Sequence, residues 1–478
     1  MTSGSRLVRR WGILPSVVGV ACCVLAGSRV RAQEEAESKV PARESAAEAE
    51  IEKTAAAAKA RAPLETRAHV TFEQILADPD NIELNFRYAK TQVARNDVRG
   101  AAATLERILL VDPALTQVKL FYGIVLFRLD NLEEAERVLR DVRERPMPPS
   151  LRAEVDGYLR EIRLRRQATR FAASLGLGYQ FDTNRNAAPS SKQRLLSDSP
   201  IGLSGTSRKR RDTSLLLIES LGFTHDLGFQ AGHQLIGSFD HFLGEQTTVD
   251  DLDLQAFSFE GGAIVRTWLA DVTATGFFDH VSLSRETFLL SPGVNVALQR
   301  DLTKRLNLFA ANRWTHEDFH GITENAAAPE RTGDRDIVSG GARYALSPAM
   351  AVTAGLAYEN KQAKAPYNAY DGFALNGSHT WLLGKGQFAI NAISYGLNVY
   401  DEPDRAISAR TRRDKQLRVR CTYGAPVSLF LGRLLPAIIS NDLTTTLSYE
   451  YFRSLSTVTN YTYLNSKITW MLAKRVEF

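Results

Sequence analysis

Apolar and polar residues alternate one by one along roughly the last three hundred residues of this chain. In the first such segment, 171–182, the odd positions are apolar or aromatic and the even positions are small or polar. A period of two predicts β-strands, because successive side chains of a strand point to opposite faces of its sheet. An apolar outside with a small or polar inside is typical of a transmembrane β-barrel, whose outer face meets lipid.

Further segments of the same kind follow the first. Their centres lie near Leu217, Phe239, Phe259, Phe277, Val294, Leu308, Gly341, Leu356, Phe373, Ile390, Val419, Leu447 and Thr469. Together they predict an antiparallel barrel of about 14 strands over residues 169–478. An even number of strands brings both barrel ends to the same side of the membrane. The chain ends on Phe478, and bacterial outer-membrane barrels commonly end on such a strand, with a terminal aromatic residue that the periplasmic assembly machinery reads.

A soluble β-sandwich would also give alternating strands, and three features favour the barrel. The chain starts with a predicted export signal, aromatic residues cluster near strand ends as in interfacial girdles, and long polar connections alternate with short ones. The predicted long outer loops are 183–210, 321–335 and 401–415, and the predicted short periplasmic turns are 226–228, 301–303 and 347–348.

The N-terminal part predicts a secretion signal followed by a linker. Arg6, Arg9 and Arg10 precede the apolar stretch 11–27, and cleavage is expected after Ala32. Residues 33–68 are rich in Ala, Glu and Lys, which predicts a loose helix or a disordered linker.

Residues 69–168 change to a helical pattern with an internal repeat. Tyr88 and Tyr122 lie 34 positions apart (122 minus 88), and three further pairs keep the same offset. These pairs are Ala89 and Gly123, Ala101 and Ala135, and Leu105 and Leu139. This is the tetratricopeptide period, so the segment predicts paired helices with small residues where the helices touch.

The concave face of such a helical stack is the predicted binding surface for an extended segment of a partner. By the phase of the repeat, the first helices place Phe86, Lys90, Gln117, Leu120 and Ile124 there. The alternative is that several of these residues pack against the neighbouring helix or the barrel.

Composition excludes some classes of protein. The formal charge of +5 comes from dispersed Lys and Arg, so no nucleic-acid partner is predicted. Cleavage after Ala32 leaves Cys421 as the sole cysteine, which excludes an intramolecular disulfide. No apolar run after the signal reaches the roughly 18 to 20 residues of a transmembrane helix. The mean hydropathy of −0.21 fits a barrel, in which lipid-facing and lumen-facing residues average out.

Two motifs suggest chemistry or ligand binding. His316-Glu317 and His320 match the zinc-protease spacing, but that site needs a helix. On the strand predicted here, residues four apart lie about 13 Å from each other and do not share a metal. The basic runs 208–211 and 410–413 fall in predicted outer loops, where docking of lipopolysaccharide phosphates and plain solvation both stay open. The sequence shows no nucleophile–base pair, phosphate loop or ligand cluster, so neither enzymatic activity nor a cofactor or metal is predicted.

The junction between the helical and strand segments carries a family resemblance. The stretch 178–189, which includes Asp182-Thr183-Asn184, and the basic helix 152–166 before it resemble the corresponding parts of the surface lipoprotein assembly modifier family. That family also joins a short periplasmic tetratricopeptide domain to a barrel of about 14 strands. Where the family often has Asp-Ser-Asn, this chain has Thr183 in the middle.

The resemblance implies a translocation factor of the outer membrane. Its periplasmic helical domain would engage a client lipoprotein or secreted protein and help it to reach the cell surface. The other implied partners are the barrel-assembly machinery, outer-membrane lipids and lipopolysaccharide. Two alternatives stay open: a polysaccharide exporter, expected to have more repeats and an acidic, aromatic lumen, and a small-solute porin, for which the helical domain would be dispensable.

Overall fold

The computed structural model describes residues 72–78, 80–323, 325–431 and 443–478. Within these residues the chain forms two compact units, one helical unit that ends at Gln167 and one barrel unit that begins at Ala168. The predicted export signal and linker, residues 1–68, lie outside the described residues.

The helical unit is built from consecutive helices joined by short turns. They are α2 (Phe72–Ala77), α3 (Ile82–Ala94), α4 (Val98–Val111), α5 (Thr116–Arg128), α6 (Leu132–Arg143) and α7 (Pro149–Arg166). Asn81 and Asp97 are the N-caps of α3 and α4, because their side chains accept hydrogen bonds from the backbone N–H groups of Leu84 and Gly100. Among the described helices, none is both long enough and apolar enough to cross a bilayer.

The repeated small residues lie where neighbouring helices pack. Ala89, Ala101 and Ala135 are fully buried, and a Cβ added to Gly123 would come within 2.8 Å of Leu139. Two apolar clusters result, one among α3, α4 and α5 and one among α5, α6 and α7. The offset of 34 therefore corresponds to stacked helix pairs with repeated packing positions.

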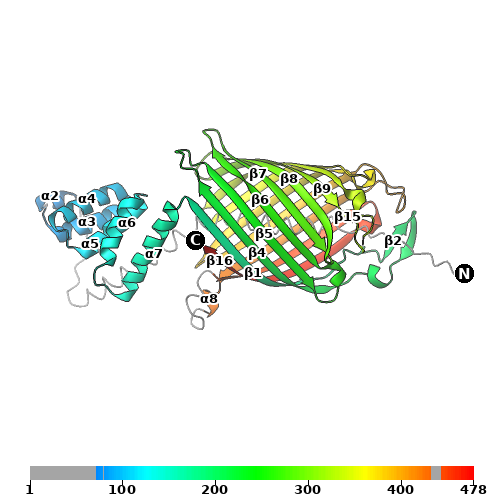
Figure 1. The fold of residues 1–478 in the computed structure, drawn as a ribbon, viewed down its shortest axis with the longest axis horizontal. Coiled ribbons are helices and arrows are strands. Elements are labelled where there is room, and N and C mark those ends of the chain that lie inside the picture. The colour runs from blue at the N-terminus through cyan, green and yellow to red at the C-terminus, as the bar shows by residue number, and fades with distance from the viewer. Residues whose placement is uncertain (1–71, 79, 324, 432–442) are drawn as a thin grey trace. The chain divides into compact units, whose positions relative to one another are not determined.

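The second unit is a closed antiparallel barrel of 14 strands (Figure 1). The strands are β1 (Thr169–Asp182), β4 (Asp212–Asp226), β5 (Gln234–Gln246), β6 (Leu254–Arg266), β7 (Asp271–Leu283), β8 (Glu286–Asp301), β9 (Leu306–Phe319), β10 (Gly333–Ser347), β11 (Met350–Lys361), β12 (Tyr370–Gly384), β13 (Gln387–Tyr400), β14 (Arg413–Pro426), β15 (Leu443–Ser456) and β16 (Tyr463–Glu477). The first and last strands pair from Ala172↔Glu477 to Asp182↔Lys467 and close the barrel. Each predicted strand centre falls inside one of these strands, so the predicted fold class is confirmed.

Both ends of the barrel chain lie at one rim, which we call the terminal end; the opposite rim is the loop end. The loop end carries the connection 183–211, with the hairpin β2 (Gln193–Leu196) and β3 (Ser199–Gly202), and the connections 320–332 and 401–412. The predicted long loops fall there and the predicted short turns fall at the terminal end. The connection between β14 and β15 departs from this alternation, since its described part contains α8 (Ser428–Leu431) at the terminal end.

The outer face of the barrel is apolar, as the alternation predicts. On β1, Leu175 and Leu177 are 48% and 54% exposed, whereas the intervening Gly176 and Gly178 face inward, where a Cβ at Gly178 would collide with Met471. Phe478 extends the last strand, since its backbone exchanges hydrogen bonds with Phe171 and the two rings stack 5.8 Å apart. A closed barrel with this apolar belt leaves no unpaired strand edge to face lipid. The chain is thus a transmembrane β-barrel protein.

Candidate functional site: a charged barrel lumen

Inward-pointing cations of β14 and β16 form a basic strip, which consists of Arg418, Arg420 and Lys467. Glu450 of β15 is the register partner of both Arg420 and Lys467. Arg420 Nε donates a hydrogen bond of 3.0 Å to Glu450 Oε2, and Arg418 Nη1 lies 3.8 Å from the same oxygen. Lys467 Nζ lies 3.7 Å from Asp182 of β1. The cations of the strip outnumber the carboxylates that contact them.

The excess of positive charge is larger at the water-accessible surface than the count of charges suggests, because the arginines are more exposed than the carboxylates. The side chains of Arg418 and Arg420 remain 24% and 31% exposed, whereas Glu450 is only 8% exposed and Asp182 only 2%. An inward side chain that keeps exposed surface borders lumenal space rather than packed protein. A solute in the lumen at this height therefore meets guanidinium groups before it meets carboxylates.

Three carboxylates on β5, β6 and β7 form an acidic wall, which consists of Asp240, Glu260 and Asp279. Seven steps of strand order separate β7 from β14 in the ring of 14, so the acidic wall lies across the lumen from the basic strip. Asp279 is anchored, since Ser258 Oγ donates to it over 2.5 Å and Arg313 of β9 over 3.4 Å. Asp240 and Asp279 are only 3% and 9% exposed, and Asp279 is paired with Arg313, so these two carboxylates present little negative charge to the lumen.

A network of charged side chains lies at the loop end of the lumen between β9 and β11. Lys361 Nζ lies 2.9 Å from Glu317 Oε2, and Arg335 Nε donates to Glu359 over 2.8 Å. Glu317 and Lys361 are 9% and 6% exposed, so these charges compensate each other within packed protein. Arg335 and Glu359 remain 29% and 21% exposed, but the network pairs two cations with two carboxylates, whereas the basic strip has an excess of cations.

The loops at this rim are held together by an arginine between two aromatic rings. The Arg412 guanidinium lies 4.3 Å from the ring centroid of Tyr400 and 3.5 Å from that of Tyr461, and its Nη2 donates to Asp414 over 2.5 Å. Burial raises the pKa of the Tyr461 hydroxyl, which therefore stays neutral. The contact joins the connection 401–412 to the connection between β15 and β16.

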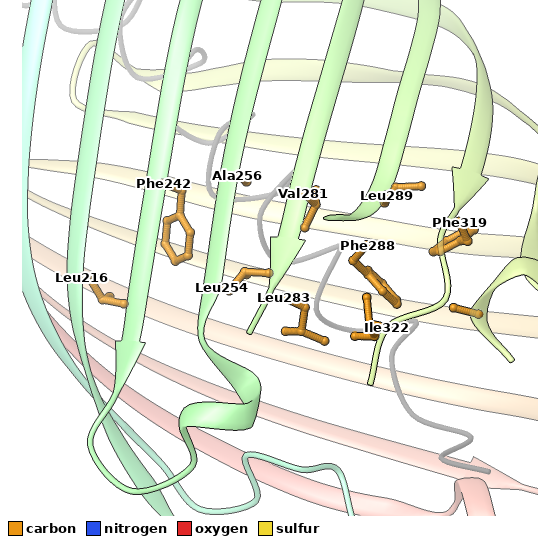
Figure 2. Close-up of a cluster of buried hydrophobic side chains, with 11 residues drawn as sticks. Leu216, Phe242, Leu254, Ala256, Val281, Leu283, Phe288, Leu289, Phe319 and Ile322 are labelled. Atoms are coloured by element: carbon orange, nitrogen blue, oxygen red, sulfur yellow. The ribbon is translucent and has the colours of Figure 1, made fainter. Parts of the chain in front are cut away.

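An apolar cluster lies inside the barrel at the loop end, against β4–β9 (Figure 2). Inward side chains of four neighbouring strands form its wall: Leu216, Phe242, Leu254, Ala256, Val281 and Leu283. The connection 320–332 folds onto this wall with Ile322 and Ala328, and Phe288 fills the space between them. The cluster occupies lumenal volume that a water-filled pore would otherwise have, so it narrows the lumen on this side.

Replacing Phe288 with Ala is expected to lower the free energy of unfolding of the barrel by about 3 to 5 kcal/mol. Phe288 is 2% exposed, and its ring meets that of Phe319 edge-on at 5.5 Å, so truncation leaves a cavity. Urea unfolding in detergent micelles, followed by heat-modifiable gel mobility, measures the change. The matched control is Phe373→Ala on the outer face of β12, where the ring is 59% exposed and the loss should be smaller. Equal losses in the two variants would contradict the buried role of Phe288.

The five predicted partner-binding residues of the helical unit take different places. Lys90 and Gln117 are exposed, and Phe86 is half-buried with Lys90 Nζ 4.2 Å from its ring centroid. Leu120 and Ile124 are 7% and 8% exposed and pack in the apolar cluster among α5, α6 and α7. The accessible part of the predicted face is thus smaller and more polar than expected, and its binding role stays a prediction.

The zinc-protease spacing falls on β9 and the turn after it, as expected of a strand. His316 points outward with Nδ1 2.7 Å from Asp334, and His320 pairs with Asp318 instead. Among the described residues, no group of three or more His, Cys, Asp or Glu side chains is arranged to hold a metal.

The two basic runs contribute to loop structure. Arg208 Nε donates to the Leu203 carbonyl over 2.9 Å, and Arg210 Nη2 donates to that of Thr248 over 3.2 Å. In the second run, Arg412 packs between two tyrosine rings. Docking of lipopolysaccharide by these runs stays a prediction.

No protein-family model and no curated protein matches this sequence. Similar solved structures include Pseudomonas aeruginosa OccK3 (OpdO), with a TM-score of 0.31 and 12% identity over 64% of this chain and 96% of that chain. Pseudomonas aeruginosa OccK8 (OprE) gives 0.33 and 8% over 65% and 98%, and Acinetobacter baumannii OccAB4 gives 0.30 and 7% over 66% and 99%. TM-scores this low carry no argument about this chain. The resemblance to the surface lipoprotein assembly modifier family has no matching family model behind it and stays a hypothesis.

The charged lumen was not predicted from the sequence, although the spacing of two of its arginines indicates part of it. Arg418 and Arg420 are two positions apart on an alternating strand, with Val419 on the other face, so their shared inward direction follows from the period of two. Their position across from Asp279 depends on strand order around a closed ring, which a local pattern does not contain.

Proposed function

We propose that the protein is an outer-membrane pore selective for small anionic solutes, with the loop end facing outward and the helical unit in the periplasm. The observation that carries this proposal is the exposure of Arg418 and Arg420 around a nearly buried Glu450. A net positive lumenal surface lowers the energy of an anion and raises that of a cation at the same position. Asp240 and Asp279 on the far side are nearly buried, so they offset this effect little.

The side chains that fill part of the lumen favour passage of a small solute over passage of a large one. Barrels of 16 to 18 strands leave an aqueous channel, whereas barrels of about eight are filled by side chains. This barrel has 14 strands, and its lumen also holds the apolar cluster and the network around Glu317. Passage of a folded protein through this lumen is not supported. Exposed arginines also differ from the acidic, aromatic lumen expected of a polysaccharide exporter.

Liposome swelling tests the proposal with solutes of matched size. Liposomes that contain the purified full chain are placed in an iso-osmotic solution of a small monocarboxylate or of a small amine cation. The account expects faster swelling with the carboxylate. Equal rates, faster entry of the cation, or no swelling above protein-free liposomes would contradict it.

A second candidate function is the translocation of a client lipoprotein or secreted protein to the cell surface. It is supported by the stacked helix pairs, on which Lys90 and Gln117 remain exposed for a partner. Protease shaving of intact cells tests it, with a candidate client co-expressed with the full chain, without it, or with a chain that lacks residues 33–168. Cleavage of the client only with the full chain would support translocation. Protection in all three strains would leave the pore as the single candidate.

A further inference from the structure

The outer wall of β4–β8 carries three parallel rows of side chains that cross neighbouring strands in register. The strands are the green ones that face the viewer in Figure 1. The groove row consists of Phe223, Gly237, Gly261, Gly276 and Val294. The ridge row consists of Leu221, Phe239, Phe259, Phe278 and Pro292. The polar row consists of Glu219, His241, Phe257, His280 and Leu290. Each row lies two residues further toward the loop end than the one before.

The groove row forms a hollow in the apolar belt. Three glycines stand side by side; the Phe223 ring lies over Gly237, whereas Gly261 and Gly276 leave open space, and Phe239, Phe259 and Phe278 stand along one edge. A Cβ added to Gly261 or Gly276 would find its nearest neighbour at 3.9 or 4.0 Å, so the space above them is open. The hollow has a volume of about 830 Å³ and is lined mainly by aromatic and aliphatic side chains. Small residues of this kind let a second membrane-embedded surface approach closely.

The polar row places ionisable groups in the middle of the same belt. Glu219 Oε2 lies 2.9 Å from His241 Nδ1, and His241 Nε2 lies 3.0 Å from Gln255 Nε2. The Glu219 side chain is 48% exposed although it stands between Leu217 and Leu221 on its strand. The row continues through stacked rings, with His241 4.6 Å from Phe257 and His280 6.1 Å from Phe257.

Contact with lipid is unfavourable for the polar row of this wall. On the lipid face of a barrel, Arg and Lys cost about 2 to 4 kcal/mol near the bilayer midplane, and Asp and Glu cost less. Ionisable residues inside membranes accordingly face protein or water in most cases. The opposite side of the barrel follows the ordinary pattern, since the outward residues near the middle of β11, β12 and β13 are Leu356, Leu375 and Ile393.

We propose that the outer wall of β4–β8 packs against the same wall of a second copy of this chain. Both copies insert in the same direction, so their polar rows and their hollows lie at equal depth. The wall is self-complementary, because the exposed Glu219 carboxylate offers acceptors and the second N–H of Gln255, beside the polar row, offers a donor. A twofold contact between identical patches is the commonest closed arrangement of protein subunits. The contact covers the ionisable groups and fills the hollow in one step.

Cysteine cross-linking in native membranes tests the proposal in a Cys421→Ser background. Gly261→Cys and Gly276→Cys place a thiol in the hollow. The matched controls, Gly340→Cys and Gly377→Cys, place one on outward glycines of β10 and β12. Copper-phenanthroline oxidation should give a cross-linked species of twice the chain mass, severalfold more abundant for the first pair than for the controls. Heat-modifiable mobility confirms that each variant is folded.

A second variant tests whether the polar contact contributes to dimer formation or whether the cysteines are only close together. Glu219→Gln in the Gly276→Cys chain should reduce the cross-linked fraction, whereas Lys415→Gln, an outward exposed residue near the loop end, should not. Folded chains that give no dimer, equal cross-linking in hollow and control positions, or cross-links only to a protein of different mass would overturn the proposal. None of these results bears on the pore proposal, because the wall is on the outside of the barrel.

Discussion

Replacing both Arg418 and Arg420 with Gln is expected to abolish the anion preference of the pore. The two guanidinium groups supply most of the exposed positive charge of the basic strip, and Glu450 becomes the nearest charge when they are lost. Two unit charges about 4 Å apart interact by about 1 kcal/mol even in water, which is about a fivefold change in permeability per charge. The ratio of anion to cation permeability should therefore fall at least about fivefold, as measured by the reversal potential in a planar bilayer under a salt gradient.

Two further variants keep this prediction testable if the double variant folds poorly. The triple variant with Glu450→Gln leaves no uncompensated carboxylate and should also lose the anion preference. The control is Arg413→Gln with Arg453→Gln, which removes two exposed arginines that point outward from β14 and β15. A reversal potential that stays unchanged in the double and triple variants would contradict the role of the basic strip, as would an equal change in the control.

Replacing residues 321–329 with a short Gly-Ser linker is expected to raise the single-channel conductance severalfold. This segment carries Ile322 and Ala328, which cover the apolar cluster inside the barrel. Without them, the space at the loop end opens to water and the lumen widens on this side. Phe319 and Thr332 are kept, because the Thr332 hydroxyl and the Phe319 backbone bond to each other at the strand end.

The matched control for the loop variant is deletion of the hairpin 193–202. This hairpin lies at the same rim but contributes no side chain to the apolar cluster. Its loss should change the conductance little. An unchanged conductance in the 321–329 variant, with the barrel folded, would show that the segment does not limit the pore.

The strands were predictable because their signal is local. A period of two needs only neighbouring residues, so it gave the positions of the strands, their inward and outward faces, and the even strand count. The same pattern placed His316 and His320 on a strand rather than a helix. The repeat of 34 was equally local, and its small residues mark the positions where the helices pack, as with Gly123 against Leu139.

The candidate site was less predictable because it depends on contacts between distant segments. Asp279 faces the basic strip only after 14 strands close into a ring. The apolar residues Ile322 and Ala328 stand in a loop, and nothing in their spacing shows that the loop folds inward. Leu120 and Ile124 have the right phase for an exposed helical face, but the packing of α6 and α7 covers them. Register across several strands also decides the row of outward glycines.

The reversal potential of the unaltered protein tests the central claim most directly. The full chain is inserted into a planar bilayer of neutral lipid with a tenfold gradient of potassium chloride. An anion-selective pore gives a potential of the sign set by chloride moving down its gradient, and this is the result that the exposed arginines predict. A potential of the opposite sign, or no conductance from correctly folded barrels, would contradict the proposed pore.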